Sequence, residues 1–141
     1  MTTDMTRDDP LLLLRDEIDV IDTEIMLAIS RRAHCAQRVA GIKQQQGDTN
    51  YYRPEREAQV LRRIMADNQG PVDNEEMARL FRQIMSACLA LEQPLKVAFL
   101  GPEGTFTQEA ALKHFGQSAI SMPKNAIDEV FREVVAGGCD Y

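Results

Sequence analysis

Charged side chains stand at positions where a helical pattern calls for apolar ones. Arg32 and Lys43 lie eleven residues apart, which on an α-helix means a rotation of about 20° and a rise of about 16 Å. Both side chains can therefore lean toward one cavity from the same side. Glu57 and Glu92 take inward positions on two later segments, and Cys88 shares a face with Glu92 at i and i+4. Two cations, two carboxyls and a small thiol fit a polar ligand pocket between helices.

The same residues fit a second interpretation, in which they only neutralise one another. Pairs of Arg32 with Glu57 and of Lys43 with Glu92 would then be internal salt bridges that fix helix register. An unpaired buried charge costs several kcal/mol, so each group needs a partner or a ligand. The pattern alone leaves both interpretations open.

The element that positions Arg32 and Lys43 is a long helix with an apolar stripe. The stripe residues recur at alternating three- and four-residue steps: Leu11, Leu14, Ile18, Ile21, Ile25, Ala28, Arg32, Cys35, Val39 and Ile42. A helix from Leu11 to Gln46 measures about 54 Å, which is too long for three helices of one short chain to cover. The stripe therefore predicts a partner chain, most simply a homodimer with intertwined long helices.

The sequence changes character at Gln93-Pro94. Before this point it predicts a polar linker over 44–52, a helix from Pro54 to the Gly70-Pro71 pair, and a helix that starts at Asp73 with a capping-box-like Glu76. After it we expect a strand over 96–100, a loop over 101–105, a helix over 107–115, a strand over 119–122, a helix over 125–136 and a third strand from Cys139. The predicted fold is an all-α, three-helix chain (domain 6–94) followed by an incomplete α/β segment (95–141).

Composition excludes several classes of protein. The 16 basic and 22 acidic residues give a net charge of −6, which disfavours nucleic-acid binding. The apolar cluster Leu11 to Leu14, like every other apolar run of the sequence, is far too short to span a membrane, and the N-terminus is not a secretory signal. We therefore expect a cytoplasmic protein without a membrane partner. The cysteines Cys35, Cys88 and Cys139 form no CxxC pair, so we expect reduced, buried thiols and no metal site.

Four separated motifs resemble the all-helical chorismate mutases of the AroQ class. They are PLLLLRDEIDVIDTEIMLAISRR, GIK, RPEREAQVL and RLFRQIMSACLALEQP, in this order from about Pro10 to Pro94. The following KVAFLGPEGTFTQEAALKHFG resembles the opening of a prephenate dehydratase domain. Together they resemble the first third of a bifunctional enzyme of phenylalanine and tyrosine biosynthesis. The Thr-Arg-Phe motif of the dehydratases is absent, so dehydratase activity is not expected of this chain alone.

The resemblance implies a role for each candidate residue. It implies an intertwined homodimer in which Arg15 reaches the partner's pocket and holds one carboxylate of chorismate, while Arg32 holds the other. It further implies that Lys43 donates to the ether oxygen of the breaking C–O bond and that Glu57 accepts the ring hydroxyl. Arg56 resembles a supporting arginine that orients the charges of the pocket.

Three other substrate-binding positions depart from the best-known bacterial pattern. Arg53 stands where an aspartate is often found, so only a main-chain contact with the substrate would survive there. Cys88 replaces a serine, and a thiol is a poor hydrogen-bond donor. Glu92 replaces a glutamine that commonly donates to the ether oxygen, so Glu92 must be protonated to do the same.

The implied reaction is the concerted rearrangement of chorismate to prephenate, which needs no cofactor and no covalent intermediate. His34 and His114 have no nucleophile beside them and fit surface or packing positions. Two rivals to this interpretation stay open: a non-catalytic helical dimerisation module, and a fragment of a bifunctional mutase–dehydratase.

Overall fold

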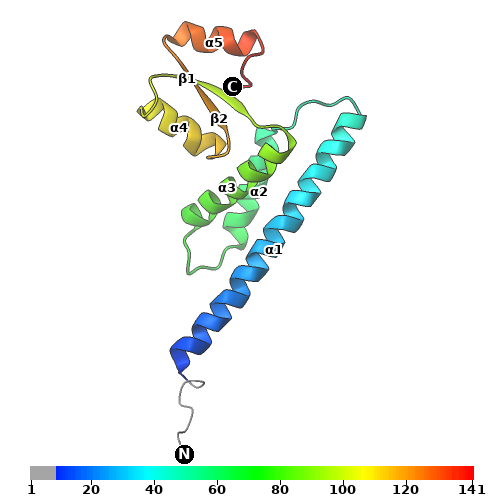
Figure 1. The fold of residues 1–141 in the computed structure, drawn as a ribbon, viewed down its shortest axis with the longest axis vertical. Helices are drawn as coiled ribbons and strands as arrows, with labels where there is room; N and C mark the ends of the chain where they lie inside the picture. Colours follow the sequence, from blue (N-terminus) through cyan, green and yellow to red (C-terminus); the bar gives the residue numbers. More distant parts are fainter. Residues whose placement is uncertain (1–8) are drawn as a thin grey trace, which may run out of the picture. The chain divides into compact units, whose positions relative to one another are not determined.

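The computed structural model describes residues 9–141, so residues 6–8 of the predicted first domain lie outside the described residues. In chain order its elements are α1 (Pro10–Gln45), α2 (Pro54–Asp67), α3 (Asn74–Glu92), β1 (Lys96–Leu100), α4 (Phe106–Phe115), β2 (Ile120–Lys124) and α5 (Ile127–Val135) (Figure 1). The chain divides into two compact units after Cys35. The second unit, 36–141, runs across the domain boundary that we placed at Gln93-Pro94.

The long helix of the heptad pattern is confirmed as α1, a single helix of 36 residues. It buries none of its residues, and seven apolar members of the stripe are each 45–57% exposed: Leu11, Leu14, Ile18, Ile21, Ile25, Val39 and Ile42. Cys35 is exposed, so the expectation of buried thiols holds only for Cys88 and Cys139. Despite this apolar surface, no helix within 9–141 is long and apolar enough to cross a membrane.

The helices α2 and α3 pack against each other and are joined by a turn that Asn68 organises. We expected α2 to reach Gly70, but it ends at Asp67. The Asn68 amide donates to the Val72 carbonyl (2.8 Å) and to the Asn74 side chain (2.9 Å), and these bonds give the chain an alternative to another helical turn. α3 begins as predicted, because the Asp73 carboxylate accepts the N–H of Glu76 at 2.8 Å.

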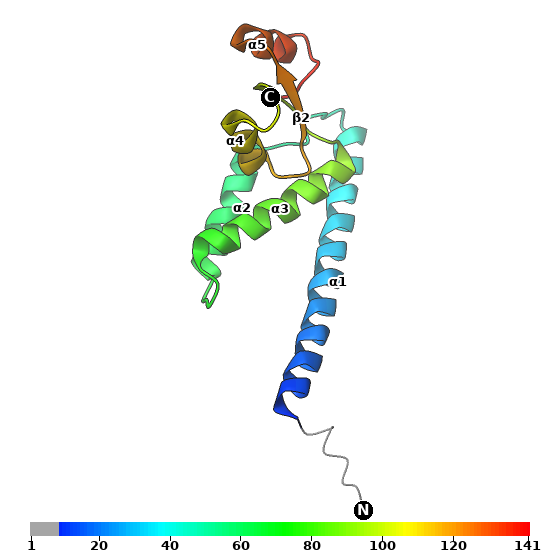
Figure 2. The same ribbon diagram turned by 60° about the vertical axis from the view of Figure 1, so that its left-hand side comes forward.

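The segment after α3 forms a two-stranded parallel sheet, with α4 and α5 on opposite faces (Figures 1 and 2). Lys96 pairs with Ile120 and Leu100 with Lys124. β1 buries three consecutive apolar residues, 97–99, as strands covered on both faces do. β2 extends to Lys124, beyond the predicted end at 122, because an edge strand tolerates Pro123.

The third strand that we predicted from Cys139 is wrong for the described residues, which form two strands only. The chain nevertheless follows β1 there: the N–H of Asp140 donates to the Lys96 carbonyl at 2.8 Å, and the N–H of Ala98 donates to the Tyr141 carbonyl at 2.6 Å. Asp140 and Tyr141 therefore lie beside β1, but two residues are too few to form a regular strand.

The α/β segment docks on α3 through Gly116, the residue that ends α4. Gly116 has φ +89°, and a Cβ placed on it would lie 2.2 Å from the Cβ of Ser86. Beside this contact the N–H of Gln117 donates to Gln83 at 2.9 Å, and the N–H of Ser118 donates to Ser86 at 3.3 Å. A glycine is therefore required for both the backbone conformation and the close approach.

We predict that Gly116→Ala lowers the free energy of unfolding by about 2–5 kcal/mol, the sum of left-handed backbone strain and overpacking. Urea unfolding monitored by circular dichroism measures this. The matched control is Gly104→Ala, because Gly104 has φ +79° and open space around its Cβ position. It should lose only the strain, about 1–2 kcal/mol. Equal losses in the two variants would contradict the close contact with Ser86.

Candidate functional site

Lys43 lies in the last turn of α1, where a cation is favoured by the helix dipole. The end of the helix is fixed by a Schellman motif: the N–H of Asp48 donates to the Lys43 carbonyl at 2.9 Å, and the N–H of Gly47 donates to the Gln44 carbonyl at 3.1 Å. Gly47 takes the left-handed conformation that this motif needs, with φ +73°. The backbone of Lys43 is thereby held at a defined place.

The side chain of Lys43 is held by the loop that follows. Its Nζ donates to the carbonyl of Asn50 at 3.2 Å, and it lies 5.9 Å from the centre of the Tyr51 ring, within cation–π range. The ammonium therefore has a fixed position near the start of α2.

Arg53 is the residue before α2 and forms an ion pair with Asp48. Asp48 also accepts the N–H of Asn50 at 3.0 Å. This bond, together with the charges of Arg53 and Lys43, holds the pKa of Asp48 below its ordinary value. The side chain of Arg53 is thus occupied within the loop, while its carbonyl accepts the N–H of Glu57 at 3.1 Å.

Glu57 lies in the first turn of α2. Its carboxylate pairs with Arg82 of α3, with Glu57 Oε1 and Arg82 Nε 3.7 Å apart. Burial raises the pKa of Glu57, and the charges of Arg82 and His114 lower it. Desolvation is the largest of these effects, so the pKa of Glu57 lies above its ordinary value, and the charge of Arg82 opposes the shift. Arg82 is a residue that the sequence analysis did not single out.

The remaining predicted residues lie on α3, α2 and α1. Cys88 is buried, 3% exposed, and Glu92 is partly buried one turn later on α3. Arg56, at the exposed start of α2, reaches Gln59 at 3.5 Å. Arg15 and Arg32 belong to the first unit, where Arg15 is exposed and Arg32 partly buried. The second unit thus brings Lys43, Arg53 and Glu57 to one end of α2, joined through the loop.

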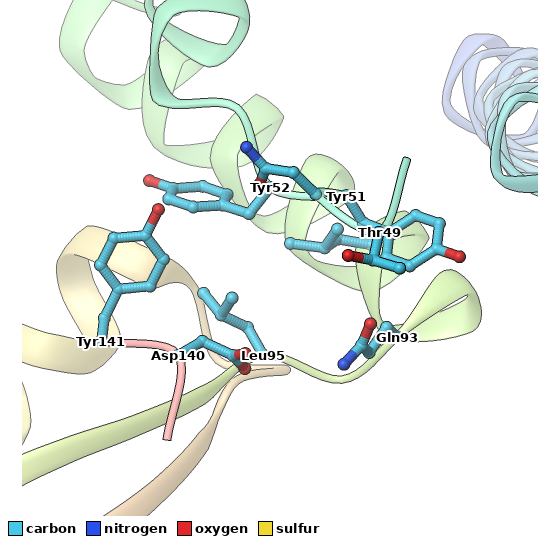
Figure 3. Close-up of a pocket in the computed structure, with 9 residues that line it drawn as sticks. Thr49, Tyr51, Tyr52, Gln93, Leu95, Asp140 and Tyr141 are labelled. Carbon is cyan, nitrogen blue, oxygen red and sulfur yellow. The ribbon is translucent and has the colours of Figure 1, made fainter. Parts of the chain in front are cut away.

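A cavity of about 170 Å³ lies next to this loop (Figure 3). Its described lining residues are Thr49, Asn50, Tyr51, Tyr52, Leu89, Gln93, Leu95, Asp140 and Tyr141. None of these is a residue that we predicted for the substrate. Among the described residues no group of three or more His, Cys, Asp or Glu is placed to hold a metal ion.

Sequence reasoning missed the residues that hold the candidate residues in place. Asp48 and Asn50 sit in a polar linker with no periodicity to reveal contacts. Arg82 lies on the same face of α3 as Ala78 and Ser86, which are both buried. The sequence held one signal for this packed face: two small residues, Ala78 and Ser86, lie eight positions apart with Arg82 midway between them. The larger apolar residues of the same helix made this signal hard to see.

Comparisons with known proteins separate two regions of the chain. The model of the family "Chorismate mutase type II" matches residues 14–93, and that of "Prephenate dehydratase" matches residues 97–141. The chain is 62% identical, over 97% of its length, to bifunctional chorismate mutase/prephenate dehydratases of Stutzerimonas stutzeri and Pseudomonas aeruginosa. It spans 39% of the length of these two relatives.

Solved structures give the same picture of the helical region. A chorismate mutase from Thermus thermophilus superposes with a TM-score of 0.58 at 32% identity, over 60% of this chain and 96% of that one. The expected fold class, three helices followed by an α/β segment, is therefore confirmed.

We predict that Arg82→Gln raises the pKa of Glu57 further, because it removes the charge that opposes desolvation. Carbon-13 NMR titration of the glutamate carboxyls measures this shift. A carboxyl whose folded pKa is raised stabilises the fold in its neutral form, below its unfolded pKa, and loses that contribution as pH rises through the folded pKa. The variant should therefore lose stability relative to the native chain as pH rises above the ordinary pKa of a glutamate and through the raised pKa of Glu57.

The matched control for this prediction is Arg79→Gln. Arg79 is one turn away on the same helix and pairs with Glu76, at an exposed site. Its removal should leave the pKa of Glu57 where it was. A Glu57 pKa that responds equally to both substitutions would show a general change of charge rather than the pairing with Arg82.

Proposed function

Because the chain belongs to the chorismate mutase type II family over residues 14–93, we propose that it isomerises chorismate to prephenate. The family match carries this proposal, and the fixed cation at Lys43 supports it. The reaction is a concerted [3,3] rearrangement, so the protein has no proton to transfer and no covalent intermediate to form. Its task is to select the reactive conformation of the substrate and to stabilise charge in the transition state.

Selection of the conformation falls to two arginines. Chorismate carries two carboxylates and is mostly extended in water, whereas the reactive form is folded into a chair-like geometry. Arg32 of one protomer and Arg15 of the other each bind one carboxylate with planar, bidentate donors. Fixing both ends of the substrate lowers the entropy that must be lost at the transition state.

Stabilisation of charge falls to Lys43 and Glu92. Negative charge grows on the ether oxygen as the C–O bond breaks, so donors aimed at this atom bind the transition state more tightly than the substrate. Lys43 is suited to this role, because backbone hydrogen bonds fix the end of its helix and the Asn50 carbonyl fixes its ammonium. Glu92 donates only when protonated. A million-fold acceleration needs about 8 kcal/mol, which two positioned donors and an enforced geometry supply in order of magnitude.

The other proposed contacts complete the pocket. Glu57 accepts a hydrogen bond from the hydroxyl of the substrate ring, and its ion pair with Arg82 favours the ionised form that this role needs. Cys88 fills the wall beside a carboxylate as a small buried thiol. Arg53 contributes through its main chain, since its side chain is paired with Asp48. Arg56 orients these charges.

The partner that we propose is a second copy of this chain. The apolar stripe of α1 is 45–57% exposed at seven positions, and α2 and α3, about 21 and 29 Å long, are shorter than this helix. A second α1 buries the stripe and brings Arg15 across the interface. The cytoplasmic location stays a prediction from the sequence.

The test is the loss of chorismate absorbance on mixing with the 141-residue chain. Arg15→Ala and Arg32→Ala should each lose nearly all turnover. When the two variants are unfolded together and refolded, half of the dimers are mixed and each holds one intact pocket, so about a quarter of the native activity should return. This recovery requires that Arg15 and Arg32 of one pocket come from different protomers.

The controls separate the possible failures. Arg38→Ala changes an exposed arginine of the same helix and should retain full turnover. Normal activity of each single variant would remove the arginines from the site. Active native chain without recovery in the mixture would contradict the exchange of Arg15, and a native chain without turnover would leave the dimerisation module as the better interpretation.

We also predict that turnover falls as pH rises from about 5 to about 9, because deprotonation of Glu92 removes a donor. Glu92→Gln carries a permanent amide donor, so its profile should be flatter and its activity at high pH greater than that of the native chain. The pH dependence of kcat measures this. Glu103→Gln, at an exposed loop position, should keep the native profile, and a flat native profile would contradict protonated Glu92 as donor.

A further inference from the structure

Tyr52 anchors the loop between α1 and α2 to the α/β segment. Its side chain is buried, 8% exposed, in a cluster with Leu95 and Val97. Its ring meets those of Phe115 and Tyr141 edge-on, with centroid distances of 5.8 and 5.2 Å. Figure 3 shows Tyr52 and Tyr141 at one end of the cavity beneath the loop. The aromatic partners of Tyr52 thus come from residues far along the chain.

The residues next to Tyr52 hold the groups that we assign to the reaction. Two positions earlier, the Asn50 carbonyl accepts a hydrogen bond from the ammonium of Lys43, and the Tyr51 ring lies beside the same ammonium. One position later, Arg53 leads into α2, and its carbonyl accepts the N–H of Glu57. A shift of Tyr52 therefore moves the contacts of both Lys43 and Glu57.

An electrostatic contact links the same tyrosine to Glu57. Burial raises the pKa of the Tyr52 hydroxyl to about 12, and the negative charge of Glu57 is the next largest cause. The phenol is therefore neutral at physiological pH and close enough to sense the carboxylate. The ring itself is packed against residues of the α/β segment.

We propose that Tyr52 is a positioning residue for the mutase reaction, through which the aromatic cluster of Phe115 and Tyr141 holds the 48–53 loop and the ammonium of Lys43 in place. This inference rests on the proposed function of the site. It gives the segment 95–141 a part in a reaction whose substrate it does not touch. The ring does the positioning, since its packing rather than its hydroxyl makes the described contacts.

The experiment compares Tyr52→Leu with Tyr52→Phe in the full 141-residue chain. Tyr52→Leu keeps an apolar side chain but loses the edge-on ring contacts, so kcat should fall by about tenfold to a hundredfold, as expected for a misplaced catalytic group. KM should change less, because Lys43 acts mainly on charge that develops in the transition state. Tyr52→Phe keeps the ring and should retain native kcat.

Two matched substitutions place the effect in the cluster. Phe115→Leu removes a ring that contacts Tyr52 and should lower kcat in the same way, with little further loss when combined with Tyr52→Leu. Phe131→Leu makes the same change in the same segment at a side chain that is 67% exposed, and it should leave kcat unchanged. Circular dichroism of each variant corrects kcat for the folded fraction.

A change in the background of Lys43 separates positioning from a structural role. Tyr52→Leu should have little effect on the residual kcat of Lys43→Gln, because the group through which it acts is gone. An equal fold-loss in both backgrounds would overturn the proposal, as would native kcat in Tyr52→Leu.

Hydrogen exchange of the 46–53 peptide gives a readout that is independent of turnover. It should become faster in Tyr52→Leu and Phe115→Leu and stay native in Tyr52→Phe and Phe131→Leu. If hydrogen exchange of the 46–53 peptide stayed native in a Tyr52→Leu chain that still consumes chorismate, the positioning role of Tyr52 would be overturned and the proposed function would stand. A native chain that does not consume chorismate would overturn the proposed function, and with it any catalytic meaning of the anchored loop.

Discussion

The apolar stripe of α1 is the constraint on which the rest of the molecule depends. The helix has 36 residues and buries none of them within this chain, and removing apolar surface from water is the main favourable contribution to folding and association. Neither α2 nor α3, with 14 and 19 residues, is long enough to cover it. The homodimer that we propose covers this helix with a second copy and brings two symmetry-related ends together. In the proposed dimer, a shared pocket follows from how the stripe is buried, and this gives an arginine such as Arg15, far along the helix from Arg32, its proposed place in the pocket.

Charge is arranged around this apolar framework so that each buried group has support. Glu57 is moved toward its neutral form by burial and toward its ionised form by Arg82. Lys43 is held by a carbonyl and an aromatic face rather than by a carboxylate alone, and this leaves the ammonium its positive charge for a ligand. For the reaction that we propose, fixed donors of this kind would cost little reorganisation when charge moves in the substrate.

The elements whose formation depends on local pattern were predictable from the sequence. The extent of α1, the cap at Asp73 and the strand 96–100 all agree with periodicity and capping chemistry. What escaped prediction depends on contacts between distant segments: the Asn68 side chain ends α2 early, and Arg82 reaches Glu57 from a face of α3 whose small residues are hard to see among larger apolar ones. The same holds for the candidate site. Its charged residues stood out from the stripes, but the residues that orient them lie in a loop without any repeat.

Packing contacts cross the boundary between the helical region and the α/β segment that composition suggests. Gln93-Pro94 interrupts the helical pattern, yet a single hydrophobic cluster joins Tyr52 of the loop, Leu89 of α3, Val97 of β1 and Phe115 of α4. Gly116 brings α4 against α3 so closely that no side chain fits between them. Residues that share a hydrophobic core tend to unfold as one cooperative unit, because each contact stabilises the fold only while the neighbouring contacts are formed. The α/β segment therefore contributes to the stability of the loop that carries Asn50, and the helical region supplies part of the surface on which the sheet is built.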